Sequence, residues 1–159
     1  MIAEDRIATT GRRTWAALID SLVVTLFVLI LFYDPLMALA QIAQEAITPE
    51  GQEKFLQAFQ AFQNRTLPYI FALYVTYHTV LVWQGGMTLG KYLLHIRVVQ
   101  AEEGAPVSFA SALGRALGRT LGEMFLFYIT FLPAFFTPLR QTLHDRLART
   151  VVVNVERQS

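Results

Sequence analysis

The chain has 159 residues, of which 54% are hydrophobic and only 16% are charged, and its net charge is +1. Soluble domains carry about 25% charged residues, so the composition indicates a membrane protein or an unusually apolar core, and long apolar blocks favour the membrane. The near-neutral charge gives no reason to expect nucleic acid binding, and the absence of cysteine excludes disulfides and thiol chemistry.

The first apolar block runs from Thr14 to Tyr33 and contains one charge, Asp20. About 20 apolar residues suffice to span a bilayer as a helix. The block is too long for the apolar region of a signal peptide and lacks a small-residue cleavage site. We therefore expect a retained transmembrane helix over about 12–33, ended by Asp34–Pro35 because proline disfavours helix in the residue before it.

Residues 34–65 form a polar connection in which apolar residues recur at helical spacing. Thr48–Pro49–Glu50 has the order of an N-cap, a first-turn proline and an acid near the helix N-terminus. Phe55, Phe59 and Phe62 follow on one helix face. We expect two amphipathic helices that cap the spans, or that form a binding lid.

A second apolar block predicts a transmembrane helix over about 66–84, followed by a cytoplasmic segment over 85–107. Two short stretches rich in β-branched residues are typical of strands. They are LHIRVVQ, which ends at Gln100, and TVVVNV, which covers Thr150–Val155. Neither is stable alone, so we expect them to pair as a small β-element.

Between these stretches, residues 108–122 predict a helix at the membrane interface, because Arg115 and Arg119 give it a charged stripe beside small residues. A third hydrophobic segment, 121–139, is interrupted by two prolines. We expect it to be re-entrant, with a third span as the alternative, and residues 140–159 to form a cytoplasmic tail.

The expected fold is therefore an all-α integral membrane domain with two full spans, a broken third segment and a small β-element. Of the 13 Lys and Arg residues, only Lys54 and Arg65 lie between the first two blocks. The positive-inside rule then places residues 34–65 outside and both termini in the cytoplasm. For a bacterium, this predicts a multi-pass protein of the inner membrane.

Asp20 is the first candidate for a functional side chain. Arg13 precedes it by seven positions, which returns to nearly the same helix face about 10 Å further along the axis. A carboxylate in the middle of a span costs about 2.5–3.5 kcal/mol, so such groups face the bundle interior and find partners. Asp20 is either a hydrogen-bonded packing clamp or an ion or proton site.

His78 is a candidate partner for Asp20, because each lies five residues inward from a tryptophan that marks the inner interface. An aspartate–histidine pair in a low dielectric can exchange a proton near neutral pH. Tyr74 and Tyr77 are near enough to donate hydrogen bonds. Alternatively, a tyrosine or a backbone carbonyl satisfies His78, which is then structural.

Two further motifs carry polar side chains. GGMTLGK, which ends at Lys91, matches the spacing of a phosphate-binding loop, but Tyr92 stands where Ser or Thr would bind magnesium. Lys91 is a better candidate for contact with anionic lipid. His144 and Asp145 are adjacent without a nucleophile or metal-ligand cluster, so we expect interfacial ion pairing, with Arg13 as a partner on the same side of the membrane.

Taken together, Arg13 with Asp20, then GGMTLGKYLLHIRVV, then RQTLHDRLARTVVV resemble the RDD family of bacterial membrane proteins. The family pattern is similar to R-x-x-A-x-x-x-D, then G-x-T-L-G-K with a following R-V-V, then L-H-D-x-L-A-x-T. Arg149 departs from the pattern, because small residues, often glycine, are common at this position. His78 and the helical outer loop are not part of the family pattern. The matching positions are Arg13, Asp20, Asp145, Gly90, Lys91, Arg97, His144 and Thr150.

The resemblance implies little about activity, although some members of the family have been linked to sodium/proton exchange. One hypothesis is cation/proton exchange through Asp20, helped by His78 or Tyr77, in an oligomer with a monovalent cation as substrate. Arg13 would then tune the acidity of Asp20 or gate it from the cytoplasm. The other is a non-transporting accessory or assembly subunit of a larger membrane complex, with Arg13, Asp20 and Asp145 as structural pins. No enzyme activity, cofactor or metal is expected, and membrane lipids are expected partners.

Overall fold

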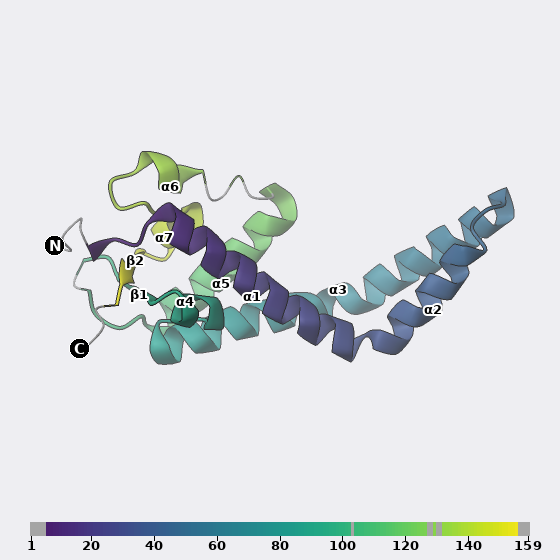
Figure 1. The fold of residues 1–159 in the computed structure, drawn as a ribbon, viewed down its shortest axis with the longest axis horizontal. Helices are drawn as coiled ribbons and strands as arrows, with labels where there is room; N and C mark the ends of the chain where they lie inside the picture. The colour runs from purple at the N-terminus through teal and green to yellow at the C-terminus, as the bar shows by residue number, and fades with distance from the viewer. Residues whose placement is uncertain (1–5, 103, 127–128, 130–131, 156–159) are drawn as a thin grey trace. The chain divides into compact units, whose positions relative to one another are not determined.

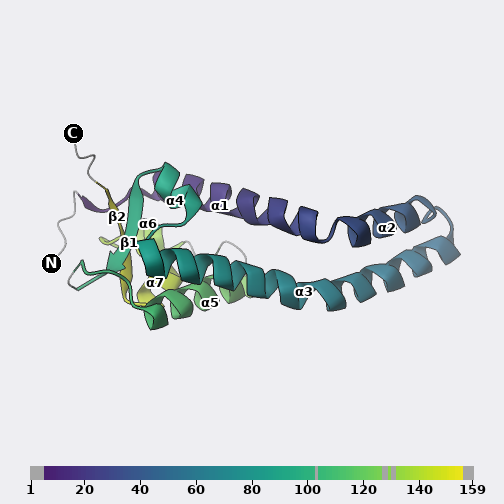
Figure 2. The same ribbon diagram turned by 90° about the horizontal axis from the view of Figure 1, so that it is seen from below.

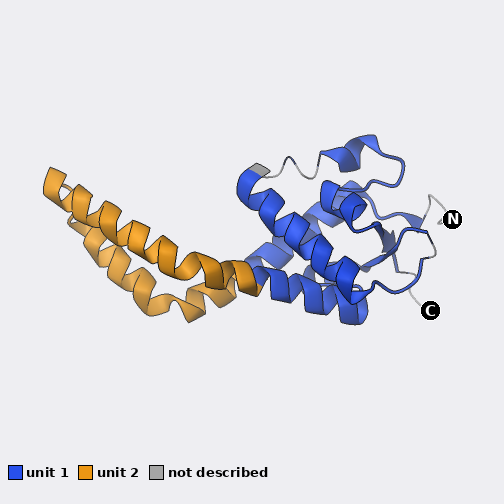
Figure 3. Cartoon of the chain, turned by 180° about the vertical axis from the view of Figure 1, so that it is seen from behind, with its two compact units in different colours: residues 1–22, 74–159 blue, residues 23–73 orange. Residues whose placement is uncertain are grey.

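The computed structural model describes residues 6–102, 104–126, 129 and 132–155 of a mostly helical chain (Figures 1 and 2). The chain divides into two compact units, Met1–Leu22 with Tyr74–Ser159, and Val23–Leu73 (Figure 3). The elements are α1 (Thr10–Leu31), α2 (Tyr33–Gln44), α3 (Pro49–Gly85), α4 (Leu89–Leu93), β1 (Ile96–Gln100), α5 (Phe109–Leu126), α6 (Pro133–Phe136), α7 (Leu143–Leu147) and β2 (Thr150–Asn154).

Within the described part of the chain, α1 is the one helix long and apolar enough to cross a membrane. Its apolar side chains are largely exposed in the isolated chain, as at Leu22 (60%) and Ile30 (73%). Lipid would cover such a surface. The second expected span lies within α3, which does not meet the same criterion of length and composition.

The unit Val23–Leu73 contains the end of α1, all of α2 and α3 from Pro49 to Leu73. Asp34–Pro35 does not end the first helix as expected, because α1 already ends at Leu31 and Pro35 lies in the first turn of α2. A proline is tolerated there because first-turn N–H groups have no helical acceptor. No residue of α2 is buried.

The expected boundary at residue 66, between an outer helix and a span, is wrong as a helix boundary. The single helix α3 begins at Pro49, where the Thr48 hydroxyl accepts a hydrogen bond from Gly51 N–H at 3.1 Å, and it continues to Gly85 with Pro68 inside it. Helical hydrogen bonds are local to the backbone, so a change from polar to apolar side chains does not interrupt them.

In the other unit, the two strand-like stretches do pair. Strands β1 and β2 are antiparallel, with Val98 opposite Val152. The N-terminal arm adds to β2 through a bridge between Ile7 and Val153 and a hydrogen bond of 2.9 Å from Ala8 N–H to the Val152 carbonyl. The arm and the last strand therefore belong to one small sheet structure, on which part of the hydrophobic core is built.

The C-terminal helices differ in extent from the sequence prediction. The interfacial helix expected over 108–122 is α5, which continues to Leu126 and packs on α7. In the hydrophobic segment 121–139, the structure describes the end of α5 and the short helix α6, which starts at Pro133. The question of a re-entrant or spanning segment depends partly on residues 127–128 and 130–131, which lie outside the described residues.

Candidate functional site

Asp20 is fully buried on α1 and accepts hydrogen bonds from the segment that follows α3. Thr88 Oγ1 donates to Asp20 Oδ2 at 2.5 Å, and Gly90 N–H donates to Asp20 Oδ1 at 2.8 Å. The Lys91 ammonium lies 3.5 Å from Asp20 Oδ2 and donates to Thr88 Oγ1 at 3.1 Å. The TLGK sequence therefore folds back onto α1 and surrounds the carboxylate with donors.

Gly90 explains why this loop can approach so closely. A Cβ atom added at Gly90 would overlap the Ala16 carbonyl oxygen and would lie 3.0 Å from Asp20 Oδ1. Figures 1 and 2 show α4 beside the early turns of α1. Only glycine lets the backbone N–H reach the carboxylate without displacing α1.

The third helix contributes Tyr77 rather than His78 to this site. Tyr77 Oη donates to Asp20 Oδ1 at 2.9 Å and accepts from Leu89 N–H at 3.2 Å. Tyr74 bonds the neighbouring Ser21 at 3.0 Å. Adjacent helix positions point about 100° apart, so His78 is turned away from the carboxylate that Tyr77 reaches.

His78 is buried and lies beside the two tyrosine rings, with ring centroids 5.3 Å from Tyr74 and 5.0 Å from Tyr77. Its Nε2 atom has no hydrogen-bond partner among the described residues. The aspartate–histidine pair considered from the sequence is therefore not among the contacts of the described chain.

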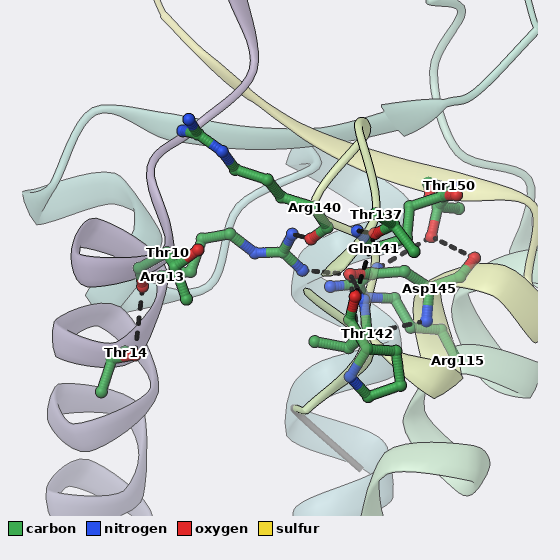
Figure 4. A network of polar contacts seen from close by, with 11 residues as sticks. Thr10, Arg13, Thr14, Arg115, Thr137, Arg140, Gln141, Thr142, Asp145 and Thr150 are labelled. Atoms are coloured by element: carbon green, nitrogen blue, oxygen red, sulfur yellow. Dashed lines mark hydrogen bonds and ion pairs between the residues drawn. The ribbon is translucent and has the colours of Figure 1, made fainter. Parts of the chain in front are cut away.

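Asp145 is the centre of a second buried network (Figure 4). One carboxylate oxygen is paired with Arg13, and the other is paired with Arg115. Thr142 donates to Asp145 Oδ2 from both its backbone N–H, at 3.0 Å, and its hydroxyl, at 2.7 Å. This capping box starts α7 and holds the carboxylate between two guanidinium groups.

Further bonds join this network to the rest of the unit. Arg13 also donates to the Arg140 carbonyl, and Arg115 donates to the Thr150 hydroxyl at 2.8 Å (Figure 4). Gln141 Nε2 donates to the Thr150 carbonyl at 2.8 Å. Thus α1, α5, α7 and β2 all meet around one carboxylate.

Among the contacts of the described residues, Arg13 and Asp20 are not partners: the arginine is bonded to Asp145 and the aspartate to Lys91 and its neighbours. The pairing of Arg13 with Asp145, considered from the sequence, is observed. The sequence reasoning missed Thr88 and Thr142, each only 1% exposed. The spacing T-x-x-D, typical of a helix start, was the available signal for Thr142.

The remaining candidate residues take supporting positions. Arg97 is exposed on β1, and its side chain covers Gly86, which has a φ of +68° and no room for a Cβ atom. Arg119 bonds Glu123 at 2.8 Å. His144 is buried on α7 and lies beside Gly118 of α5. Burial, together with nearby guanidinium groups, lowers the pKa of His144 well below its usual value, so its neutral form is favoured.

Burial also lowers the pKa of Lys91 to about 7, although the carboxylate of Asp20 raises it in part. No group of three or more His, Cys, Asp or Glu side chains suitable for a metal ion is found among the described residues. In the networks around Asp20 and Asp145, the carboxylate oxygens are bonded to donors from the protein itself.

Comparison with known proteins adds an independent observation. The sequence model of the RDD family matches residues 7–149. The uncharacterized membrane protein YteJ of Bacillus subtilis (strain 168) is 27% identical over 97 residues, which cover 60% of this chain and 55% of that relative. The match therefore spans about half the length of the relative. No solved structure matches.

Proposed function

Since the chain belongs to the RDD family of membrane proteins, we propose that it is a non-transporting membrane module, an accessory or assembly subunit of a larger membrane complex. In this role Arg13, Asp20 and Asp145 are structural pins. One observation supports the proposal most directly: the fully buried carboxylates of Asp20 and Asp145 are each bonded to donors from separate segments of the chain.

The geometry explains how such pins act. The Asp20 contacts fasten residues 88–91 to α1, and the Asp145 contacts fasten α7 to α1 and α5. Leaving one partner of a buried ion pair without the other costs about 3–5 kcal/mol. Rigid attachment of this kind stabilises a fixed surface for a partner, and it does not require the carboxylates to change ligands.

A second candidate function is monovalent cation/proton exchange at Asp20. It is favoured by the oxygen atoms that the Tyr77 and Thr88 hydroxyls place at 2.9 and 2.5 Å from the carboxylate, because carboxylate and hydroxyl oxygens suit hard cations. Lys91, at 3.5 Å, would compete with such a cation for Asp20.

One experiment separates the two functions. The purified protein is reconstituted in proteoliposomes, and collapse of a pH gradient by sodium, lithium or potassium is measured for the native chain and for Asp20→Asn. The structural role predicts no cation response from the native chain and loss of the thermal transition in Asp20→Asn. A native cation response that disappears in Asp20→Asn, with the thermal transition retained, would instead establish exchange.

The accessory role also requires a stoichiometric partner. Solubilisation in a mild detergent followed by a mass measurement of the intact particle gives the partner's stoichiometry directly. We expect a particle whose mass is larger than 18.0 kDa, the mass of this chain, and is not a whole-number multiple of it. A pure homo-oligomer or a monomer would contradict the accessory role.

We further propose an inner-membrane topology in which the apolar second half of α3 is a second span and both termini are cytoplasmic. The distribution of Lys and Arg supports this orientation. Since the chain has no cysteine, single cysteines at Gln52 and Glu102 give an unambiguous test. An impermeant maleimide should label Gln52→Cys in intact spheroplasts and Glu102→Cys only after lysis; the reverse result would refute the orientation.

A further inference from the structure

A cavity of about 260 Å³ opens between α1, α5 and the segment that contains α6. Most of its wall is apolar, and two arginine residues, Arg13 and Arg119, line one part of it. The apolar wall includes Leu18, Leu132 and Phe135. A cavity with an apolar wall and a cationic part is chemically complementary to an amphiphile that has an anionic head.

The apolar residues of the wall are also exposed on the surface: Leu18 is 48% exposed, Leu132 50% and Phe135 64%. Leu18 lies on α1, the candidate transmembrane helix, so lipid chains would have direct access to this wall. Arg13 lies in the first turn of α1. The cationic part therefore falls at the end of the span, the depth at which lipid headgroups lie.

The charges near the cavity are unequal. Arg13 and Arg115 share the single carboxylate of Asp145, and Arg119 is bonded to Glu123. Among the described residues of these two ion clusters there is one more guanidinium than carboxylate. Lys91 and Asp20 form a separate pair outside these two clusters.

A surplus positive charge in this setting is costly. Arg13 is 8% exposed, Arg115 6% and Arg119 5%, so little water screens the three guanidinium groups. An anion bound at the cavity would offset the extra guanidinium charge counted in these two described clusters. Arginine is well suited to bind phosphate because its planar group presents paired donors, and basic pockets between helices at the cytoplasmic side are known to bind anionic lipid heads.

We propose that this cavity binds an anionic membrane phospholipid, with the phosphate against Arg13 and Arg119 and one acyl chain along Leu18, Leu132 and Phe135. The cavity is smaller than the roughly 300–1,000 Å³ of pockets that enclose a whole drug-sized molecule. It accommodates part of one chain, while the rest of the lipid stays in the bilayer. The inference goes beyond the accessory role and does not depend on it.

The test uses the full chain in a neutral detergent and follows its melting temperature as lipid is added. The four probes are dioleoyl phosphatidylglycerol, dioleoyl phosphatidylcholine, oleate and inorganic phosphate. Phosphatidylglycerol should raise the melting temperature in a saturable way, with an apparent affinity about tenfold higher than that of phosphatidylcholine, as one to two favourable charge contacts provide.

Two matched substitutions on the same helix localise the site. Leu18→Trp fills the cavity and should abolish the phosphatidylglycerol shift, whereas Leu22→Trp, one turn further and 60% exposed outside the cavity wall, should retain it. Both positions are exposed, so both variants should fold. Arg119→Gln should reduce the preference for phosphatidylglycerol over phosphatidylcholine.

Each other outcome overturns the proposal. Equal shifts with phosphatidylglycerol and phosphatidylcholine would mean that no anionic head is recognised. A shift with inorganic phosphate of the same size would mean that the acyl chain does not contribute, and a shift with oleate alone would identify a fatty acid site. An undiminished phosphatidylglycerol shift in Leu18→Trp would place the lipid elsewhere.

Discussion

Arg13 and Asp145 lie 132 positions apart in the sequence and form a buried ion pair that joins the first turn of α1 to α7. Asp145 is fully buried, and Arg13 is 8% exposed. The pair makes the first and last described helices depend on each other. Its removal therefore affects the whole unit rather than one helix.

Replacement of Arg13 by glutamine should lower the free energy of unfolding by about 3–5 kcal/mol, because Asp145 then keeps only one of its two cationic partners in a buried site. Chemical denaturation in detergent measures the change. Arg12→Gln is the matched control: Arg12 is exposed and bonds Asn154 Oδ1 at 2.8 Å, and its loss should cost no more than about 0.5 kcal/mol. Equal effects of the two substitutions would contradict a special role for Arg13.

Alanine at Gly90 should destabilise the chain by about 1–3 kcal/mol, since the added methyl group would overlap the Ala16 carbonyl and separate residues 88–91 from Asp20. At Gly114, which is also helical, an added Cβ atom would meet no neighbour within 4 Å. Gly114→Ala should therefore stabilise α5 by up to about 0.5–1 kcal/mol. The thermal transitions of the two variants should shift in opposite directions.

The stability of the chain should rise between about pH 7 and pH 10 in a way that depends on Lys91. Burial lowers the pKa of Lys91 to about 7 in the folded chain, while an unfolded lysine keeps its proton until about pH 10.4. Between these values the unfolded state binds more protons, so the free energy of unfolding increases with pH, by at most about 1.4 kcal/mol per unit.

Lys91 faces Asp20 and the three guanidinium groups of Arg13, Arg115 and Arg119, so the pH profile of the native chain alone would not isolate it. The contribution of Lys91 is isolated by the difference in the free energy of unfolding between the native chain and Lys91→Gln, measured at each pH. That difference should be constant below about pH 6 and should grow in favour of the native chain above about pH 7. A flat difference across the whole range would show that Lys91 keeps its proton when folded.

Glycine at position 149 should stabilise the chain by roughly 0.5–1 kcal/mol. Arg149 has a φ of +51°, in the left-handed region, and its side chain is exposed. A residue with a Cβ atom is destabilised there by about 1–2 kcal/mol, and part of the gain is offset by the larger backbone entropy of glycine in the unfolded chain. Arg149→Ala keeps the Cβ atom and should give no gain; if alanine stabilised equally, the backbone explanation would fail.

The same backbone angle explains why glycine suits the position at which this sequence departs from the pattern it resembles. The family pattern often has a small residue, glycine among them, at the position of Arg149, and the structure shows the conformation in which glycine is favoured. A single sequence could reveal the departure but not its cause, because the φ value arises from the turn between α7 and β2.

The strand pairing was predictable from local pattern, since short β-branched stretches have no stable alternative to pairing with each other. The side chain of α3 that bonds Asp20 could not be predicted in this way. Depth along two antiparallel helices placed both Tyr77 and His78 near it, but the rotation of α3 decides which side chain points inward. Sequence spacing gives depth along an axis, and it leaves the rotation of one helix against another undetermined.

The extent of α3 could not be read from composition either. The polar-to-apolar change near Thr66 marks a change of environment along one continuous helix, Pro49–Gly85. Similarly, TLGK could be recognised as a motif, but its closure over Asp20 depends on the Gly90 contact with Ala16, which is formed by packing rather than by local spacing.

The bridge between Ile7 and Val153 also determines when this unit can be completed during synthesis. The ribosome releases the N-terminal arm and α1 long before β2 exists. For most of that interval Asp145 has not been synthesised either, so Arg13 lacks its partner, and the arm has no strand to join. The last described strand, Thr150–Asn154, therefore completes the unit: a chain that stops before this strand contains every described helix and the ion pairs of Asp145, but β1 and the N-terminal arm have no strand to pair with.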